Sequence, residues 1–202
     1  MFIYLHGLNS SSQSRKARWL AQRVAPRTFL APDYNAHLVD ESLEKLNQFI
    51  FKAVRRTDSP ATPTLTLIGS SLGGVYAQYL AKRFNAAIVL INPALLPRAQ
   101  LLEHLGPQFN HATGQSYELL VEHVDRLNDL RQSNPPENID SLLLVDEGDE
   151  VIPFRFAVEF YKNHGNTVIY PGGSHAFDHM EAALPLILEI HDQHEQKTRR
   201  KQ

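Results

Sequence analysis

The sequence contains no cysteine among its 202 residues, which excludes disulfide bonds, thiolate nucleophiles and cysteine-based metal sites. It also lacks an apolar run near the roughly 20 residues that a transmembrane helix needs. No basic segment precedes the short apolar start MFIYLHG, so no signal peptide is expected. Neither sign of charge is in clear excess, with 20 Lys and Arg against 22 Asp and Glu. Nucleic acid as a partner and insertion into a membrane are therefore not expected, and the absences together favour a cytoplasmic protein.

The sequence consists mainly of short apolar segments that alternate with helix-compatible segments. Strands are expected over residues 2–5, 28–31, 64–68, 87–91, 141–145 and 167–170. Helices are expected at about 15–24, 40–56, 73–84 and 178–194. Continuous apolar strands of this kind are typical of a parallel sheet that helices cover on both faces. The length and the absence of a linker predict a single α/β domain over residues 1–202, with about six strands.

Residues 92–140 form an unusually long stretch between two of the expected strands. The stretch contains a predicted helix near 115–130. In an open α/β sheet such an insertion commonly lies over the carboxyl ends of the strands, where ligands bind. Both a partial cap and a longer crossover fit the sequence. At the other end, residues 195–202 are strongly basic and are expected to be frayed.

Two adjacent serines, Ser70 and Ser71, lie within GSSLG at residues 69–73. The pattern Gly-x-Ser-x-Gly fits only Ser71, because isoleucine and leucine would flank Ser70 at the corresponding positions. A nucleophile elbow requires small residues there, since the tight turn brings them against neighbouring backbone. An apolar strand leads into the motif and a helix-compatible segment follows it. Ser71 is therefore the predicted nucleophile and Ser70 a structural residue; a glycine-rich turn without catalytic role is the alternative.

A nucleophilic serine needs a base, and the sequence PGGSHAF offers His175 after the last expected strand. The two glycines before it allow the loop to turn sharply. His179 is the alternative, four residues further on and expected within the last helix. The pair has the spacing of metal ligands, but the glutamate of H-E-x-x-H is absent, so we predict no metal site.

The acid that orients the base should follow the preceding strand, where the sequence reads DEGDE at 146–150. Asp149 is the predicted acid, because Gly148 before it permits a bend toward the site. Glu150 is expected to point away from the site, and at most one of Asp146 and Glu147 could face it, since neighbours on a strand point to opposite faces. Each of the four acids could also be a solvated loop charge.

Oxyanion stabilisation needs backbone N–H groups near the nucleophile. One is expected from Leu72, the residue after the serine. The other is expected from Leu8, in the loop HGLN after the first strand, where Gly7 allows close approach. His6 in the same loop is interpreted as a buried structural histidine.

These motifs together resemble the small bacterial α/β-hydrolases of the YqiA/YcfP esterase type. The resemblance spans nearly the whole chain and depends on YLHGLNSS (4–11), GSSLGG (69–74), INPA (91–94), TGQ (113–115), GDEV (148–151) and GGSHAF (172–177). It implies an α/β-hydrolase fold without the first two antiparallel strands, and hydrolysis of a small-molecule acyl ester or thioester. It also implies a triad of Ser71, Asp149 and His175, and a mechanism that needs no cofactor.

Other functions use the same residues or the same fold. A peptidase or an acyl-transferase would need the same triad. A non-catalytic interaction protein on a hydrolase scaffold is a further alternative, although a complete Ser/Asp/His set has no chemical reason to persist unused. A fluorophosphonate, which labels active-site serines, is expected to label any of these enzymes but not a non-catalytic interaction protein.

Overall fold

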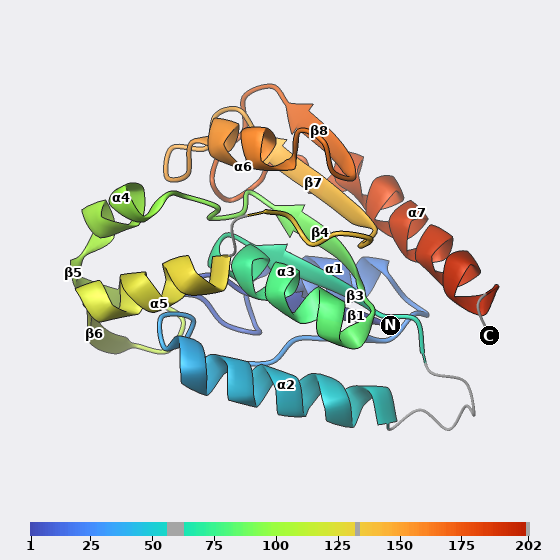
Figure 1. Ribbon diagram of the computed structural model, residues 1–202, viewed down its shortest axis with the longest axis horizontal. Helices are drawn as coiled ribbons and strands as arrows, with labels where there is room; N and C mark the ends of the chain where they lie inside the picture. Colours follow the sequence, from blue (N-terminus) through green and yellow to red (C-terminus); the bar gives the residue numbers. More distant parts are fainter. Residues whose placement is uncertain (56–62, 132–133, 201–202) are drawn as a thin grey trace.

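A six-stranded, entirely parallel sheet forms the centre of the computed structural model, which describes residues 1–55, 63–131 and 134–200 (Figure 1). Its strands are β1 (Phe2–Leu5), β2 (Phe29–Leu30), β3 (Thr66–Ser70), β4 (Ala87–Ile91), β7 (Ser141–Asp146) and β8 (Asn166–Tyr170). Their order across the sheet is β2-β1-β3-β4-β7-β8. The prediction of a parallel sheet of about six strands is confirmed.

The interior strands are buried on both faces, as their continuous apolar sequences predict. All residues of β1, β3, β4 and β7 are buried, whereas the edge strands β2 and β8 are partly exposed. In the shared register Leu67 of β3 lies between Ile3 of β1 and Ile88 of β4. The side chains of β4 alternate between two separate apolar cores, with Val89 in one and Leu90 in the other.

Helices cover both faces of the sheet, and each face has its own core. One face carries α1 (Arg15–Arg23) and α7 (Met180–Arg199), which contribute Leu20 and Ile187 to one core. The other face carries α2 (Val39–Arg55), α3 (Leu72–Phe84), α5 (Val121–Arg131) and α6 (Phe154–Tyr161). None of the helices in the described ranges is long and apolar enough to cross a membrane.

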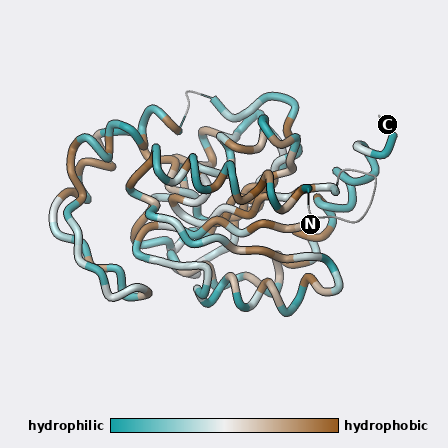
Figure 2. Tube along the Cα trace, turned by 90° about the horizontal axis from the view of Figure 1, so that it is seen from below, coloured by the Kyte–Doolittle hydropathy of each residue, from teal (hydrophilic) through white to brown (hydrophobic). Residues whose placement is uncertain are grey.

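The long insertion contains a β-hairpin that the sequence pattern did not predict. After α4 (Arg98–Leu101) and a short 3₁₀ turn (Leu102–His104), strands β5 (Gly106–Asn110) and β6 (Gln115–Leu119) pair antiparallel. The helix expected near 115–130 is therefore wrong over its first six residues, because α5 begins only at Val121. Most of the hairpin is exposed, so it carries little of the apolar signal on which the prediction depended. Figure 2 shows it extending away from the body of the molecule.

The last helix continues beyond its predicted end at 194. It reaches Arg199, which forms an ion pair with Glu195 one turn earlier at 3.1 Å. His194 anchors this part of the helix, because its ring nitrogens lie 2.8 Å from Asp140 and 2.9 Å from the Asn85 carbonyl oxygen. Residues 195–199 are thus helical in the structure, where the sequence predicted a frayed tail. The sequence RRTDSPATP at 55–63, whose prolines and small polar residues predict a surface connection, lies almost wholly outside the described residues.

A turn with no room for side chains joins β3 to α3. A Cβ added at Gly73 would lie 2.0 Å from the Leu5 carbonyl oxygen, and one at Gly69 would lie 2.4 Å from the Gly73 carbonyl oxygen. Real Cβ contacts are never this short, and both obstacles are backbone atoms that cannot move aside independently. The two glycines are therefore required by the close packing of β1, β3 and α3.

Replacing Gly73 with alanine should lower the free energy of unfolding by about 3 kcal/mol or prevent folding, because the methyl group would push α3 away from β1. The matched control is Gly114→Ala in the hairpin turn, where φ is +73° but no atom lies within 4 Å of the added Cβ. We expect that change to cost about 1 kcal/mol, from backbone strain alone. Urea unfolding of both variants measures the difference, and equal losses would contradict the steric requirement.

Candidate active site

Ser71 occupies the strained turn at the carboxyl end of β3. Its φ of 53° and ψ of −124° lie in a region that non-glycine residues rarely adopt. The turn is held by the Ser71 N–H, which donates to the Ile91 carbonyl oxygen at 3.0 Å. Ser71 is partly exposed at the N-cap of α3, whereas the Ser70 residue is only 3% exposed. The turn therefore presents Ser71 to solvent and buries its neighbour.

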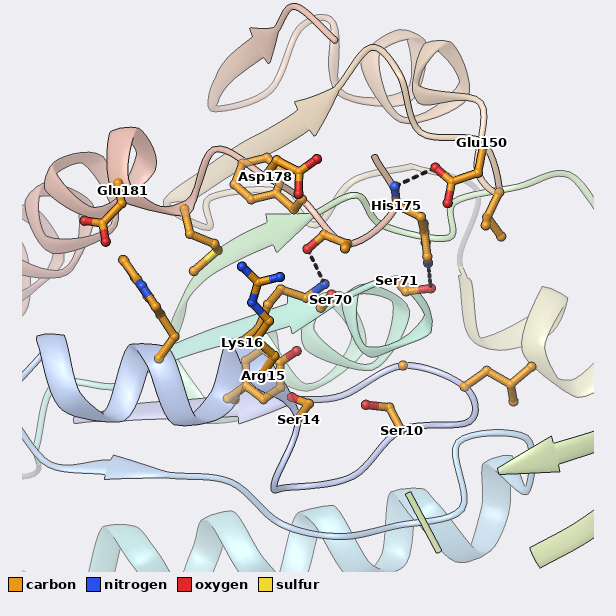
Figure 3. A pocket seen from close by; sticks show the side chains of 18 residues that line it. Ser10, Ser14, Arg15, Lys16, Ser70, Ser71, Glu150, His175, Asp178 and Glu181 are labelled. Atoms are coloured by element: carbon orange, nitrogen blue, oxygen red, sulfur yellow. Dashed lines mark hydrogen bonds between the residues drawn. The ribbon is translucent and has the colours of Figure 1, made fainter. Parts of the chain in front are cut away.

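The structure brings the side chains of Ser71, His175 and Asp149 together from three separate loops. His175 Nε2 lies 3.2 Å from Ser71 Oγ (Figure 3). His175 Nδ1 lies 2.9 Å and 3.0 Å from the two carboxylate oxygens of Asp149. With the proton on Nδ1, the imidazole donates to Asp149 and offers Nε2 as acceptor to the serine hydroxyl.

The Asp149 carboxylate is held by the backbone that follows it. Its Oδ1 accepts hydrogen bonds from the N–H groups of Val151 at 2.9 Å and Ile152 at 2.7 Å. The side chain is 1% exposed, compared with 24% for His175. These hydrogen bonds fix the orientation of the Asp149 carboxylate, so that its oxygens face the imidazole of His175.

Glu150 lies beside the site, against the expectation that it points away. Its carboxylate accepts the backbone N–H of His175 at 2.9 Å (Figure 3), and this bond lowers the pKa of Glu150. The loop of Gly172 and Gly173 passes close to Gly148, whose N–H donates to the Gly172 carbonyl oxygen at 2.7 Å. The sequence separates these two loops by more than twenty residues, so their contact is a result of the tertiary fold.

Asp146 is a buried carboxylate that organises the loop carrying His175. It is 0% exposed and accepts the N–H groups of Ser174 at 3.2 Å and Asp178 at 2.8 Å. Its other oxygen lies 2.8 Å from His179 Nδ1. His175 and His179 therefore pair with different aspartates, and His179 stands at the N-cap of α7 instead of within the helix.

Asn92 links the same loop to β4 and β7, and sequence reasoning missed its role. Its amide donates to the Ser174 carbonyl oxygen at 2.9 Å and accepts the Asp146 N–H, also at 2.9 Å. The residue is 2% exposed and has a φ of 41°. The available signal was the motif INPA directly after an apolar strand, since an asparagine tolerates positive φ better than most residues.

Two backbone N–H groups beside Ser71 have no internal acceptor. Within the described residues, neither the Leu8 nor the Leu72 N–H donates a hydrogen bond. Gly7 packs directly against the serine, and a Cβ built there would lie 3.3 Å from Ser71 Oγ. Both leucines line one cavity together with Ser71.

Cavities lie on two sides of Ser71, and their linings differ. One has a volume of about 480 Å³ and is lined by Arg15, Lys16 and Trp19 of α1 as well as by Ser71 and His175 (Figure 3). Burial lowers the pKa of Lys16 to about 8, and its Nζ donates to the Ala176 carbonyl oxygen at 3.0 Å.

The second cavity, of about 250 Å³, lies under the insertion. Its lining is largely apolar, and the insertion supplies Leu96, Leu101, Leu119, Val124 and Leu127. The insertion thus forms a wall of the site. The described part of the chain contains no cluster of three or more His, Asp or Glu side chains arranged to hold a metal ion.

Comparisons with known proteins agree with this architecture. Residues 1–192 match the model of the family described as "UPF0227: Uncharacterised protein family". Among solved structures, Est1E from Butyrivibrio proteoclasticus with bound ferulic acid superposes with a TM-score of 0.70 at 18% identity, over 93% of this chain and 88% of that one. A structure of the metagenome-derived lipolytic enzymes LipS and LipT gives 0.68 at 18% identity, over 95% and 93%. An α/β superfamily hydrolase from Oenococcus oeni gives 0.65 at 15% identity, over 95% and 92%.

Replacing Asp146 with alanine should lower the free energy of unfolding by about 3 kcal/mol, because two backbone N–H groups and the His179 ring would lose their buried acceptor. The control is Asp178→Ala in the same loop, where the side chain is exposed and the expected loss is below about 1 kcal/mol. Chemical denaturation followed by circular dichroism provides the comparison. Similar small losses in both variants would show that Asp146 does not organise the loop.

Proposed function

This chain belongs to the UPF0227 family and has the α/β-hydrolase fold, and on that premise we propose that it is a serine hydrolase. Membership confirms the resemblance to the YqiA/YcfP type that the sequence motifs predicted. The proposed reaction is cleavage of carboxylic esters or thioesters through an acyl-enzyme on Ser71. The proposal assigns this activity to one domain spanning residues 1–202.

The observation that carries the proposal is the continuous hydrogen-bonded chain from Ser71 through His175 to Asp149. Its two links measure 3.2 Å and 2.9 Å. A serine hydroxyl is a weak nucleophile unless a base removes its proton, and an imidazole fixed by a buried carboxylate is suited to that task. These side chains follow β3, β7 and β8 in the order nucleophile, acid, base that α/β-hydrolases use.

In the proposed first step, Ser71 Oγ attacks the carbonyl carbon of the ester while His175 Nε2 accepts its proton. Asp149 stabilises the resulting imidazolium and keeps the proton on Nδ1. The carbonyl oxygen becomes an oxyanion, which the N–H groups of Leu8 and Leu72 stabilise. Collapse of the tetrahedral intermediate then expels the alcohol or thiol, and His175 returns the proton to it.

The proposed second step repeats this chemistry with water as the nucleophile. His175 accepts a proton from water as the water oxygen attacks the acyl-enzyme, and the same two N–H groups stabilise the second oxyanion. Ser71 recovers its proton when the carboxylic acid leaves. Every proton transfer uses an imidazole nitrogen, so the mechanism requires no metal or cofactor.

The substrate proposed for this site is a small-molecule ester or thioester with an apolar portion. The largely apolar cavity beside Ser71 supports this assignment, because apolar surface buried there contributes roughly 25 cal/mol per Å² to binding. The larger cavity along α1 offers polar and charged side chains to the remainder of the molecule.

Replacing Ser71 with alanine should abolish labelling by a fluorophosphonate and lower p-nitrophenyl ester hydrolysis by several orders of magnitude. Ser70→Ala should retain both activities to a substantial degree, because Ser70 lies buried behind the turn. Mass spectrometry of the labelled wild-type protein identifies the modified residue. An adduct on Ser70, or full turnover by the Ser71→Ala protein, would refute the proposal.

Replacing Asp149 with asparagine should leave the melting temperature nearly unchanged and lower kcat by about 10⁴-fold, since the amide would favour the wrong imidazole tautomer. The matched control is Glu147→Gln, an exposed acid two residues earlier, which should leave kcat within about twofold. Steady-state kinetics on one ester measures both. Comparable kcat values for the two variants would remove Asp149 from the proposed triad.

A further inference from the structure

A chain of side-chain hydrogen bonds ties the β5–β6 hairpin to the loop after β1. The Tyr117 hydroxyl of β6 donates to Asn9 Oδ1 at 2.8 Å. Asn9 Nδ2 donates to Gln108 Oε1 of β5 at 3.1 Å, and Gln108 Nε2 donates to the His104 carbonyl oxygen at 3.1 Å. Residues about one hundred positions apart in sequence are thereby joined through the amide of Asn9.

The direction of this chain leaves each amide a single orientation. Asn9 accepts through its oxygen and donates through its nitrogen, and Gln108 does the same with the next partner. Burial raises the pKa of Tyr117 to about 12, so the phenol remains a donor across the physiological range. Because every donor and acceptor in this hydrogen-bonded series is fixed, the series holds the amide planes of Asn9 and Gln108. It thereby also holds the backbone to which these side chains are attached.

Further contacts hold the two segments at the same place. Asn110 Nδ2 donates to the Ser10 carbonyl oxygen at 3.3 Å. The Tyr117 ring stacks on His37, with 3.9 Å between centroids and 12° between planes. Asn9 itself has a φ of 52°, a backbone conformation that costs energy and needs support from its surroundings. The hairpin supplies that support through polar side chains at the edge of the apolar core, against which the half-buried Tyr117 ring packs.

The loop after β1, which the hairpin holds through these contacts, carries the Leu8 N–H. On one side of Leu8, Gly7 packs against Ser71; on the other, Asn9 is held by the hairpin. We propose that Asn9, Gln108 and Tyr117 are positioning residues that direct the Leu8 N–H at the oxyanion, which makes the hairpin a part of the catalytic apparatus. This inference rests on the proposed serine-hydrolase function. Asn9 and Gln108 also line the cavity proposed for the substrate, whereas Tyr117 does not, so a change at Tyr117 separates positioning of the loop from contact with substrate.

The test compares Tyr117→Phe, which removes the hydroxyl and keeps the ring stacked on His37, with the wild-type protein. The matched control is Tyr79→Phe on α3, where the side chain is exposed and its hydroxyl has no hydrogen bond to any described residue. The readouts are kcat and KM for a p-nitrophenyl ester, and the affinity for an alkyl boronic acid. Boron forms a bond to Ser71 Oγ, His175 takes the serine proton, and the resulting tetrahedral boronate anion places one of its hydroxyl oxygens where the oxyanion develops.

We expect Tyr117→Phe to lower kcat about tenfold with KM within twofold, less than the 10²- to 10³-fold that follows outright loss of an oxyanion donor. Boronate affinity should weaken by the same factor as kcat. Tyr79→Phe should match the wild type in every readout. A purely structural role for Tyr117 would lower the melting temperature without a selective loss of boronate affinity, and that result would overturn the proposal, as would an unchanged kcat.

Two further variants keep the test decisive. Asn9→Gly removes the amide and tolerates the positive φ, and combined with Tyr117→Phe it should cost little more than either change alone, since both break one chain. If Tyr117→Phe does not fold, Gln108→Met, which removes hydrogen bonding at similar size, replaces it; the criterion is then kcat alone, because Gln108 also lines the cavity beside Ser71. The wild-type protein tests the underlying function separately. Absence of both turnover and a boronate adduct on Ser71 would refute the proposed hydrolase function. An active wild-type protein with unaffected variants would refute only the positioning role of the hairpin.

Discussion

The close approach of β1, β3 and α3 is the constraint on which the remainder of the site depends. Because no Cβ fits at Gly69 or Gly73, the chain can pass from strand to helix in one tight turn with Ser71 at its apex. The same approach brings Gly7 against the serine and aligns the start of α3 beneath it. Strain at a positive φ is tolerated there because the flanking sheet and helix leave the turn no alternative conformation.

Two aspartates, one at the end of β7 and one just after it, position the same histidine in different ways. Asp149 faces the imidazole of His175 directly, whereas Asp146 holds the backbone of the same loop through Ser174 and Asp178. Both carboxylates are buried, so each must be matched by donors. The donors to Asp146 come from the loop that carries His175, whereas Asp149 also accepts N–H groups of the backbone that follows it. The energy required to bury these charges is thus offset by contacts that also orient the proposed base.

The insertion contributes to the site in two physically different ways. Its apolar side chains, including Leu101 and Val124, line a cavity next to Ser71. Its exposed hairpin instead contacts the β1 loop through polar side chains, above all through Asn9. Apolar burial stabilises without directional preference, whereas hydrogen bonds between amides specify orientation. The two kinds of contact therefore suit the two proposed tasks, which are to accommodate the substrate and to hold backbone donors in place.

The sequence by itself determined the parallel sheet, because continuous apolar runs between helices allow few other folds. It also determined which of the two adjacent serines lies at the apex of the turn, because the steric demand of the turn is local. It also predicted Asp149 and His175, which the tertiary structure brings within hydrogen-bond distance of one another and of Ser71. Only the tertiary structure decided the roles of Asp146, Asn92 and Glu150, and the presence of the hairpin. These features depend on pairs of polar groups far apart in the chain, and polar contacts, unlike apolar periodicity, leave no regular spacing in sequence from which a partner can be predicted.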